Sequence, residues 1–415
     1  MVRELDLDEF LAEGAKGDGA ECEPWWCDPK TIPPREFLYS RHFIRKDISA
    51  TIGAGGRGKT SNSHVEAVSM AVGRNLMTGQ ELPAPLRVLI LNGEETQDEL
   101  DRRLAAVCQR HGISQADLSR RLFVRSVRAK PPRFATLVRG EAVLNQEALS
   151  ALEAEIRANA IDIFILDPLI SFHRVRENIN EDMDLLIKEG FGGVASRTNS
   201  AGELLHHPGK PKPGAAENTV EDARGASAII WAVRNARVFN FMTPDEAGKL
   251  GIPEDRRRRH IRISNGKANV GPLGKAEWIT IQVEILPNGD EVACASRWSP
   301  PNPFDGISST DMELARQLAQ TGAYRADPRS PKWFGYALAE QLHIPITYRG
   351  DNDAKDIARL KSIIKTWLKN NALKIEIRKD DERKDREFIV AGSFASRTDP
   401  TGDNPHFADD DITLQ

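Results

Sequence analysis

The chain has 415 residues, and its 57 Lys and Arg against 61 Asp and Glu leave a formal net charge of −4. At about 150 residues per domain, this length predicts two or three domains. No apolar run approaches the ~18–20 residues that a membrane-spanning helix needs, and the acidic start MVRELDLDEF lacks the pattern of a signal peptide. We therefore expect a cytoplasmic protein with no membrane partner.

Charge is distributed unevenly along the chain. Residues 1–30 hold nine acidic and three basic residues, and residues 399–415 hold five Asp and no Lys or Arg. Residues 328–398 hold fifteen basic and ten acidic residues. We predict acidic tails at 1–30 and 398–415, a core at 31–295, a Pro-rich linker at 296–331 that can hold one short helix, and a basic domain at 332–397. Cys22 and Cys27 have no second pair or nearby His, so the pattern favours reduced thiols over a zinc site.

The middle of the chain alternates strand-like and helix-like segments. Residues 88–91 and 163–166 are short, continuous apolar runs, as expected of strands buried on both faces of a parallel sheet. Between them, apolar residues recur with helical spacing at Leu100, Leu104, Val107 and Cys108, and again at Leu149, Leu152 and Ile156. This alternation predicts an α/β fold with a parallel sheet.

The strongest motif is a phosphate-binding loop after the predicted strand 48–52. It consists of Gly53, Ala54, Gly55, Gly56, Arg57, Gly58, Lys59 and Thr60, with Ser61 following. Its glycines allow successive backbone N–H groups to converge on phosphate oxygens at the start of a helix, whose apolar face is predicted at Val65, Val68, Val72 and Leu76. Lys59 is expected to contact the β- and γ-phosphates of ATP, and the Thr60 hydroxyl to bind Mg²⁺.

Three carboxylates complete the predicted site. Asp167 ends the apolar run 161–166, where ligands bind in open α/β sheets, and we predict that it holds Mg²⁺. Glu94 and Glu95 follow the strand RVLILN and would lie beside the phosphate loop if that strand neighbours it. We predict Glu94 as the catalytic base and Glu95 as an acid that complements a helix dipole. Capping roles are the alternative for Asp167 and Glu94.

Together, the phosphate loop, the Glu94–Glu95 pair, ILDPL, a His–His pair and RGASAIIWAVR resemble the RecA-like core of the RepA, KaiC and DnaB group of ATPases over about residues 31–290. The resemblance is nearest to RepA-type hexameric helicases and related AAA-family ATPases of plasmids and integrated elements. It implies a RecA-like P-loop core, ATP and Mg²⁺ as cofactors, and assembly of identical subunits into a ring, expected to be a hexamer.

The resemblance also implies roles for single residues. His206 matches the position of a γ-phosphate sensor, with His207 as its neighbour. Arg234 matches a finger that reaches the ATP of the adjacent subunit, with Arg237 as the runner-up one helical turn later. An arginine on a helix surface is the structural alternative. Lys267, in Lys-Ala-Asn, resembles an element that points at the neighbouring nucleotide.

Three features depart from the family pattern. Arg57 stands where the family usually has a small or apolar residue. The segment 199–205 before His206 is poorer in apolar residues than a central strand should be. The preceding predicted helix carries Gly190, Gly192 and Gly193, each of which costs about 1 kcal/mol relative to Ala in a helix interior.

Two loops of the core would face the centre of a ring, and the second resembles the DNA-contacting loops of RecA-like proteins. One spans residues 172–178. The other spans residues 208–214 and carries Lys210 and Lys212, which can meet the backbone phosphates of single-stranded DNA. An ordinary surface loop is the alternative.

The C-terminal segment has its own pattern. Helices predicted at 333–342 and 353–370, followed by two strands around the charged turn KDDERKD, are typical of a winged helix. In such a domain the second helix enters the major groove of duplex DNA. We predict that Lys361 and Lys365 on that helix bind DNA. A winged helix that binds proteins is the alternative.

The sequence thus predicts an α/β protein: a RecA-like P-loop NTPase core with a parallel sheet, followed by a small winged-helix domain. The function that it favours is a magnesium-dependent ATP hydrolase acting on DNA, either a ring-forming RepA-like helicase or translocase or another replication-associated ATPase. The alternative is an ATP-dependent regulatory or recombination-type switch that binds DNA without unwinding it.

Overall fold

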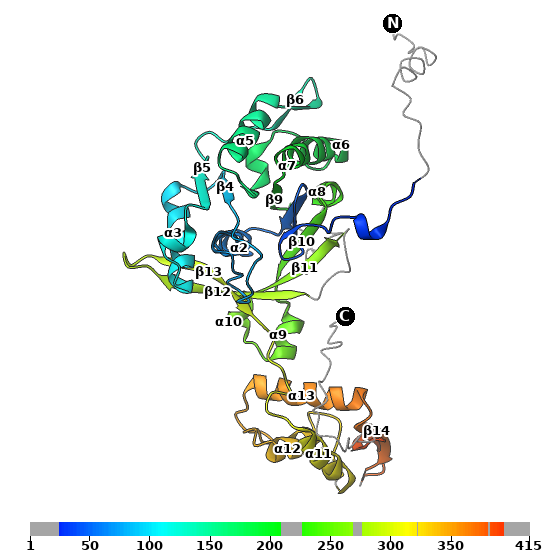
Figure 1. Cartoon of the computed structure of the whole chain (residues 1–415). Helices are drawn as coiled ribbons and strands as arrows, with labels where there is room; N and C mark the ends of the chain where they lie inside the picture. Colours follow the sequence, from blue (N-terminus) through cyan, green and yellow to red (C-terminus); the bar gives the residue numbers. More distant parts are fainter. Residues whose placement is uncertain (1–24, 209–225, 269–275, 322, 381, 394–415) are drawn as a thin grey trace. The chain divides into compact units, whose positions relative to one another are not determined.

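The computed structural model describes residues 25–208, 226–268, 276–321, 323–380 and 382–393 (Figure 1). The chain divides into two units, Met1–Glu36 and Phe37–Gln415. In the first unit a turn of 3-10 helix, η1 (Pro29–Thr31), begins after Asp28, whose carboxylate accepts a hydrogen bond from the Lys30 amide. The second unit holds the main sheet and its covering helices.

A nine-stranded sheet forms the centre of the second unit, with the strand order β13-β12-β11-β10-β3-β9-β8-β4-β5. The strands from β10 to β5 in this order are parallel, and β11, β12 and β13 extend the sheet in antiparallel fashion from β10. Their bounds are β3 (Ile48–Ile52), β4 (Val88–Asn92), β5 (Leu122–Ser126), β8 (Ile163–Asp167), β9 (Ala201–His206), β10 (Asn235–Phe241), β11 (His260–Ala268), β12 (Glu277–Ile285) and β13 (Glu291–Trp298). The predicted α/β fold with a parallel sheet is confirmed.

Helices cover both faces of this sheet, because its central strands are apolar on both sides. One face packs against α2 (Lys59–Val72) and α3 (Gln97–His111) through Val65, Val68 and Val107. The other face packs against α5 (Gln146–Ala158), η3 (Leu185–Gly192), α7 (Gly193–Thr198) and α8 (Ala226–Ala232). Leu89 and Leu91 of β4 point to this second face, whereas Val88 and Ile90 join a different cluster.

Strand order corrects one premise of the sequence analysis. The strand that carries Glu94 at its end, β4, does not neighbour β3, because β9 and β8 lie between them. The helix after the phosphate loop is also shorter than predicted. It ends at Val72, where Gly73 adopts a left-handed conformation with φ of 78°, so Leu76 lies outside the helix.

The polar strand before His206 is nevertheless a central strand. All six residues of β9 are buried between β3 and β8. Gly202 is required by close packing, since a Cβ atom there would lie 2.5 Å from Cζ of Phe164 and 2.6 Å from Cδ1 of Ile48. Glu203 is stabilised by hydrogen bonds from Thr51 and His42. The glycine-rich segment before β9 forms η3, a π-helix, rather than a regular α-helix.

Residues beyond the sheet form a separate hydrophobic cluster that includes Trp333, Phe334, Leu360 and Trp367. Three helices, α11 (Ser309–Thr321), α12 (Phe334–Gln341) and α13 (Ala354–Lys369), precede an antiparallel ribbon of β14 (Leu373–Lys379) and β15 (Asp385–Ala391). This element order is the one predicted for a winged helix, which remains a prediction.

Short elements complete the described chain. They are β1 (Phe37–Tyr39), β2 (Phe43–Ile44), α4 (Gln115–Leu118), β6 (Ala135–Val138), β7 (Glu141–Leu144), η2 (Leu169–Phe172), α6 (Asn180–Asp184), α9 (Pro244–Leu250) and α10 (Glu254–Arg257). Within the described ranges, none of the helices combines the length and apolar character needed to cross a bilayer.

Candidate nucleotide site

The phosphate loop connects the end of β3 to the start of α2, as predicted. Gly56 and Gly58 have φ values of 74° and 69°, a region that favours glycine. A Cβ atom at Gly58 would also lie 2.8 Å from Cδ1 of Ile261, and one at Gly53 would lie 3.0 Å from the Phe239 carbonyl oxygen. Backbone conformation therefore favours glycine at Gly56, close packing requires it at Gly53, and both apply at Gly58.

Lys59 is held inside this loop. Its Nζ donates hydrogen bonds to the carbonyl oxygens of Gly53, at 2.5 Å, and Ala54, at 3.1 Å. It also lies 3.0 Å from Nδ1 of His207. When the His207 ring is neutral, this nitrogen can accept a hydrogen bond from the Lys59 ammonium group. Burial lowers the pKa of Lys59 to about 8. The sequence had indicated His207 only as a neighbour of His206.

Thr60 and Asp167 meet at the carboxyl ends of the strands. The Thr60 hydroxyl donates a hydrogen bond of 2.8 Å to Oδ2 of Asp167, and Nδ2 of Asn92 lies 3.3 Å from the same oxygen. Asp167 is 3% exposed, and burial raises its pKa to about 6. These are the two residues that the sequence predicted to hold Mg²⁺, and Asn92 was not predicted.

Glu94 and Glu95 have different surroundings. Both backbone N–H groups donate to Oδ1 of Asn92, at 2.9 and 2.7 Å, so the end of β4 fixes the turn. The Glu95 carboxylate forms an ion pair of 2.7 Å with Arg103 on α3. Glu94 is exposed, and its charge acts on both Lys59 and Asp167. The charge of Glu95 raises the pKa of Asp167 more strongly than that of Glu94 does, so the choice of Glu94 as the catalytic base stays a prediction.

His206, at the end of β9, is buried beside the phosphate loop. Its Nδ1 lies 3.5 Å from Oε1 of Glu177, which is also 3.5 Å from Nε2 of His173. Neither ring nitrogen of His206 has a hydrogen-bond partner within the described part of the chain. Burial lowers its pKa to about 4, so the ring is neutral near pH 7. The contact of Glu177 with His206 could not be predicted, because the sequence does not show how the chain between these two residues folds.

The structure separates the two arginines proposed as fingers. Arg234 lies between α8 and β10, with 47% of its side chain exposed and Asp47 at 3.4 Å. Arg237 does not lie one helical turn later, because α8 ends at Ala232 and Arg237 belongs to β10. It is buried in a bidentate ion pair with Glu66, both contacts being 2.6 Å. Arg237 is therefore not free to reach an adjacent subunit.

Two other basic residues named from the sequence have contacts within the chain. Nζ of Lys267 donates to the carbonyl oxygens of Ile230 and Trp231, at 3.0 and 2.9 Å. Arg57 donates to the Phe239 carbonyl and lies over the ring of Phe241, with 5.5 Å to its centroid. Arg57 thus attaches the phosphate loop to β10, which accounts for this departure from the family pattern.

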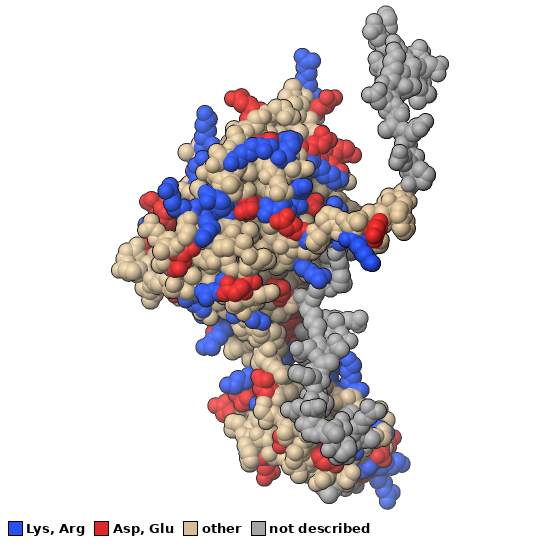
Figure 2. Space-filling model, in the orientation of Figure 1, with Lys and Arg blue, Asp and Glu red and all other residues tan. Residues whose placement is uncertain are grey.

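The predicted DNA contacts are divided between described and undescribed segments. Lys210 and Lys212 lie outside the described residues. Lys361 and Lys365 are exposed on α13, whereas Arg359 on the same helix donates to backbone oxygens of Pro303 and Asp305. On the face shown in Figure 2, basic and acidic side chains of the described core are interspersed.

Comparison with known proteins agrees with the geometry of the phosphate loop. Residues 24–213 match the family model of an AAA domain. Among solved structures, the crystal structure of the RadB recombinase aligns with 62% of this chain and 93% of its own, with a TM-score of 0.39 and 9% sequence identity. The match to the family model and the phosphate loop make residues 24–213 similar to nucleotide-dependent P-loop ATPases of the AAA domain family.

Proposed function

We propose that this protein is a magnesium-dependent ATP hydrolase that acts on DNA as a ring-forming helicase, translocase or replication-associated ATPase. The observation that carries this proposal is the convergence of Lys59, the Thr60–Asp167 pair and Glu94 at the carboxyl ends of β3, β8 and β4. This edge of an open α/β sheet is where ligands bind.

The residues at this edge fit a magnesium ion. The Thr60 hydroxyl and the Asp167 carboxylate offer the oxygen ligands that Mg²⁺ prefers, and both would hold it directly or through water. Burial makes the charged form of Asp167 unfavourable, so a cation nearby would be stabilising. When bound, Mg²⁺ neutralises the charge of the phosphate oxygens.

The chain's own groups supply the remaining chemistry. Backbone N–H groups of the loop and the Lys59 ammonium bind the phosphates, with Lys59 exchanging its carbonyl partners for phosphate oxygens. Glu94 accepts a proton from the attacking water as its oxygen bonds to the γ-phosphorus and the bond to the leaving ADP oxygen breaks. His206, which is neutral near pH 7, would donate its one ring N–H to a γ-phosphate oxygen.

Arg234 supports assembly of several subunits. Its guanidinium is half exposed at a position that makes no contact with this chain's own phosphate loop in the described residues. An exposed arginine that stabilises phosphoryl charge in the next subunit would couple hydrolysis to assembly. We expect light scattering to show a multimer that forms or grows with ATP. A strict monomer with full ATPase activity would contradict this role.

ATP turnover of Glu94→Gln tests the catalytic proposal, with Glu95→Gln as its matched control. Loss of a general base lowers turnover by about 10²–10⁴-fold. We expect Glu94→Gln to show this loss while retaining ADP binding, because the backbone N–H groups of the loop and Lys59, which bind the phosphates, are unchanged. Glu95→Gln should retain most activity, because its carboxylate pairs with Arg103. Equal losses in both variants would contradict the assignment of Glu94.

Nucleic acid provides the second test. Single-stranded DNA should stimulate ATP turnover, with salt-dependent and sequence-independent affinity. Lys361→Ala/Lys365→Ala should weaken binding of duplex DNA while leaving basal turnover unchanged. Strand displacement with ATP would identify a helicase or translocase. DNA binding without displacement or stimulation would favour the alternative of an ATP-dependent switch.

A further inference from the structure

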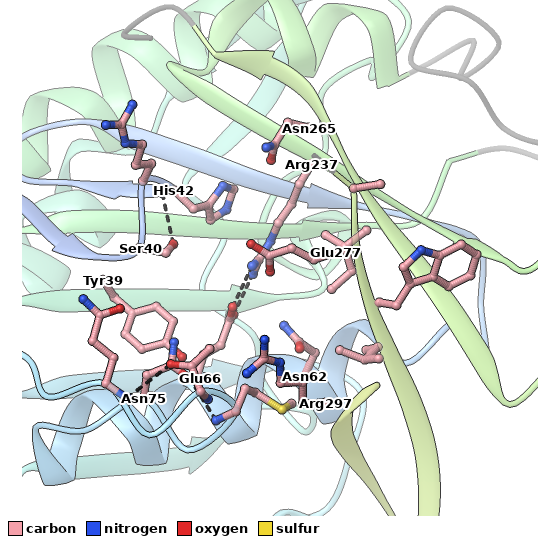
Figure 3. A pocket seen from close by; sticks show the side chains of 18 of the residues that line it. Tyr39, Ser40, His42, Asn62, Glu66, Asn75, Arg237, Asn265, Glu277 and Arg297 are labelled. Atoms are coloured by element: carbon pink, nitrogen blue, oxygen red, sulfur yellow. Dashed lines mark hydrogen bonds and ion pairs between the residues drawn. The ribbon is translucent and has the colours of Figure 1, made fainter. Parts of the chain in front are cut away.

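A second cavity, of about 1010 Å³, lies in the same unit but does not include the phosphate loop. Its walls come from the β1–β2 segment, helix α2, the loop at residues 75–83 and strands β10, β11 and β12 (Figure 3). Asn235 in its wall pairs with Ser49 at the start of β3, whereas the phosphate loop follows the end of β3. The cavity is at the upper end of the range of ~300–1,000 Å³ for ligand pockets.

Buried, paired charges line part of this cavity. Arg237 donates to Glu66 through two nitrogens and to the Thr51 hydroxyl through Nε at 2.7 Å. Its Nη2 also lies 3.7 Å from Glu203. Figure 3 shows the Arg237 and Glu66 side chains directed toward each other across the cavity. Because two carboxylates already neutralise this guanidinium, it is not a site for an anion.

Two other polar groups, buried Asn62 and exposed Glu277, also line the cavity. Nδ2 of Asn62 has no hydrogen-bond acceptor among the described residues, although Asn62 is only 3% exposed. Glu277 lies close enough for its charge to raise the pKa of Arg237, but no ion pair within 4.0 Å is formed between them. A ligand would therefore satisfy this site by offering an acceptor to Asn62 and a donor to Glu277.

Flat apolar groups and cations complete the lining. Trp278 and Trp298 both line the cavity, with ring centroids 5.5 Å apart. The rings offer stacking or edge contacts to a flat ligand. Arg41 and Arg297 also line it and are exposed, so their guanidinium groups can meet an anion from solvent.

We propose that this cavity binds a nucleotide unit, with the base inside and the phosphate toward Arg41 and Arg297. A nucleobase presents a donor and an acceptor on one edge of a flat aromatic ring, which matches Glu277, Asn62 and the tryptophans. A simple amine would leave Asn62 unsatisfied, and a simple carboxylate would face Glu277. The unit is either a free mononucleotide or one residue of a single strand. This inference does not depend on ATP hydrolysis at the phosphate loop.

Equilibrium dialysis of radiolabelled ADP and of a labelled deoxyadenylate octamer tests the proposal without any turnover. The background is Lys59→Ala, which disables the phosphate loop. Because the octamer can also bind at the proposed DNA contacts, it is measured with Lys210→Ala, Lys212→Ala, Lys361→Ala and Lys365→Ala also present. In these backgrounds we expect one remaining site for ADP, for the octamer or for both. Adding Glu277→Gln should weaken that site about ten-fold, as expected for loss of a hydrogen bond to a charged group. Adding Glu291→Gln, on β13 and outside the cavity lining, should leave it unchanged.

The two ligands distinguish the source of the nucleotide. If ADP binds and Glu277→Gln weakens its binding, the ligand of the cavity is a free nucleotide. If only the octamer binds and Glu277→Gln weakens its binding, the ligand is a single strand. Trp278→Leu gives an independent check and should weaken the same ligand, with circular dichroism confirming the fold. Absence of binding in the Lys59→Ala background, or binding that neither Glu277→Gln nor Trp278→Leu weakens, would overturn the proposal.

Discussion

Two groups of buried charges each include a residue of α2, Lys59 in one and Glu66 in the other. The pKa shifts favour the neutral form in the first group and the charged form for Arg237 and Glu203 in the second. At the phosphate loop, burial lowers the pKa of Lys59 to about 8 and raises that of Asp167 to about 6, so both move toward the neutral form. In the second group, burial disfavours the charged forms of Arg237 and Glu203, but the opposite charges beside them have the larger effect on their pKa values. The pKa of Arg237 is raised and that of Glu203 is lowered.

The difference separates a binding site from a structural ion pair. Arg237 donates two hydrogen bonds of 2.6 Å to the Glu66 carboxylate, so the two groups stabilise each other without any ligand. Among the described residues, the hydrogen-bond partners of Lys59 are neutral groups, namely two carbonyl oxygens and His207. A buried charge that lacks a charged partner in the folded chain is one that a ligand can complete.

The largest expected effect comes from removing the charge at the phosphate loop. Lys59→Ala should reduce ATP turnover by at least about 10³-fold, because the ammonium stabilises charge on the transferring phosphoryl group. Its stability without nucleotide should change little, since burial already disfavours the lysine. ATPase assays and urea denaturation measure the two quantities. Retained turnover would remove the catalytic interpretation of the phosphate loop.

The paired group should respond in the opposite way. Arg237→Met should lower the free energy of unfolding by about 3–5 kcal/mol, because it leaves Glu66 and Glu203 as uncompensated buried charges. Urea denaturation at pH 7 measures the change. Arg234→Ala is the matched control and should stay within about 0.5 kcal/mol, because Arg234 is half exposed. A loss below 1 kcal/mol in Arg237→Met would mean that the ion pair does not hold the fold.

Asp167→Asn, which removes the charge of one buried side chain, should change stability and activity in opposite directions. Between pH values of about 4 and 6 the folded protein binds more protons at Asp167 than the unfolded chain, so this group's contribution to stability falls as pH rises and remains unfavourable at pH 7. We expect Asp167→Asn to raise the free energy of unfolding at pH 7 by about 1–2 kcal/mol. Magnesium-dependent turnover should be lost. Denaturation at pH 4 and pH 7 checks the sign, and a variant less stable at pH 7 would contradict it.

Local motifs made much of the core predictable. The residues from Gly53 to Thr60 specify the turn, the anion site and the start of a helix within a few positions, and Asp167 follows an apolar run that can only be a buried strand. The α/β fold followed from alternation of such runs with helical spacing. For these features, the chemical requirement and the sequence signal lie in the same short segment.

Long-range order was not predictable from the same signals. Nothing local places β9 and β8 between β3 and β4, so the neighbour assumed for Glu94 was wrong. The assumption that the helix continued from Arg234 to Arg237 also failed, because a buried arginine in a strand has the same sequence appearance as one on a helix. Glu203 appeared unsuited to a central strand because its partners, Thr51 and His42, lie far away in the sequence.

The smallest expected effect concerns His207, which neither group of charges includes. Its Nδ1 lies 3.0 Å from Nζ of Lys59, and a bound nucleotide would compete for the same ammonium. If Lys59 leaves His207 when phosphates bind, His207→Ala should tighten ADP binding a few-fold, because a hydrogen bond of about 1 kcal/mol no longer has to be broken. His207→Asn retains a hydrogen-bond acceptor, so its affinity for ADP should be closer to that of the native chain. Calorimetric titration with ADP measures both. Weaker binding in His207→Ala would instead show that His207 holds the nucleotide itself, which would extend the binding site from β3 to the loop after β9.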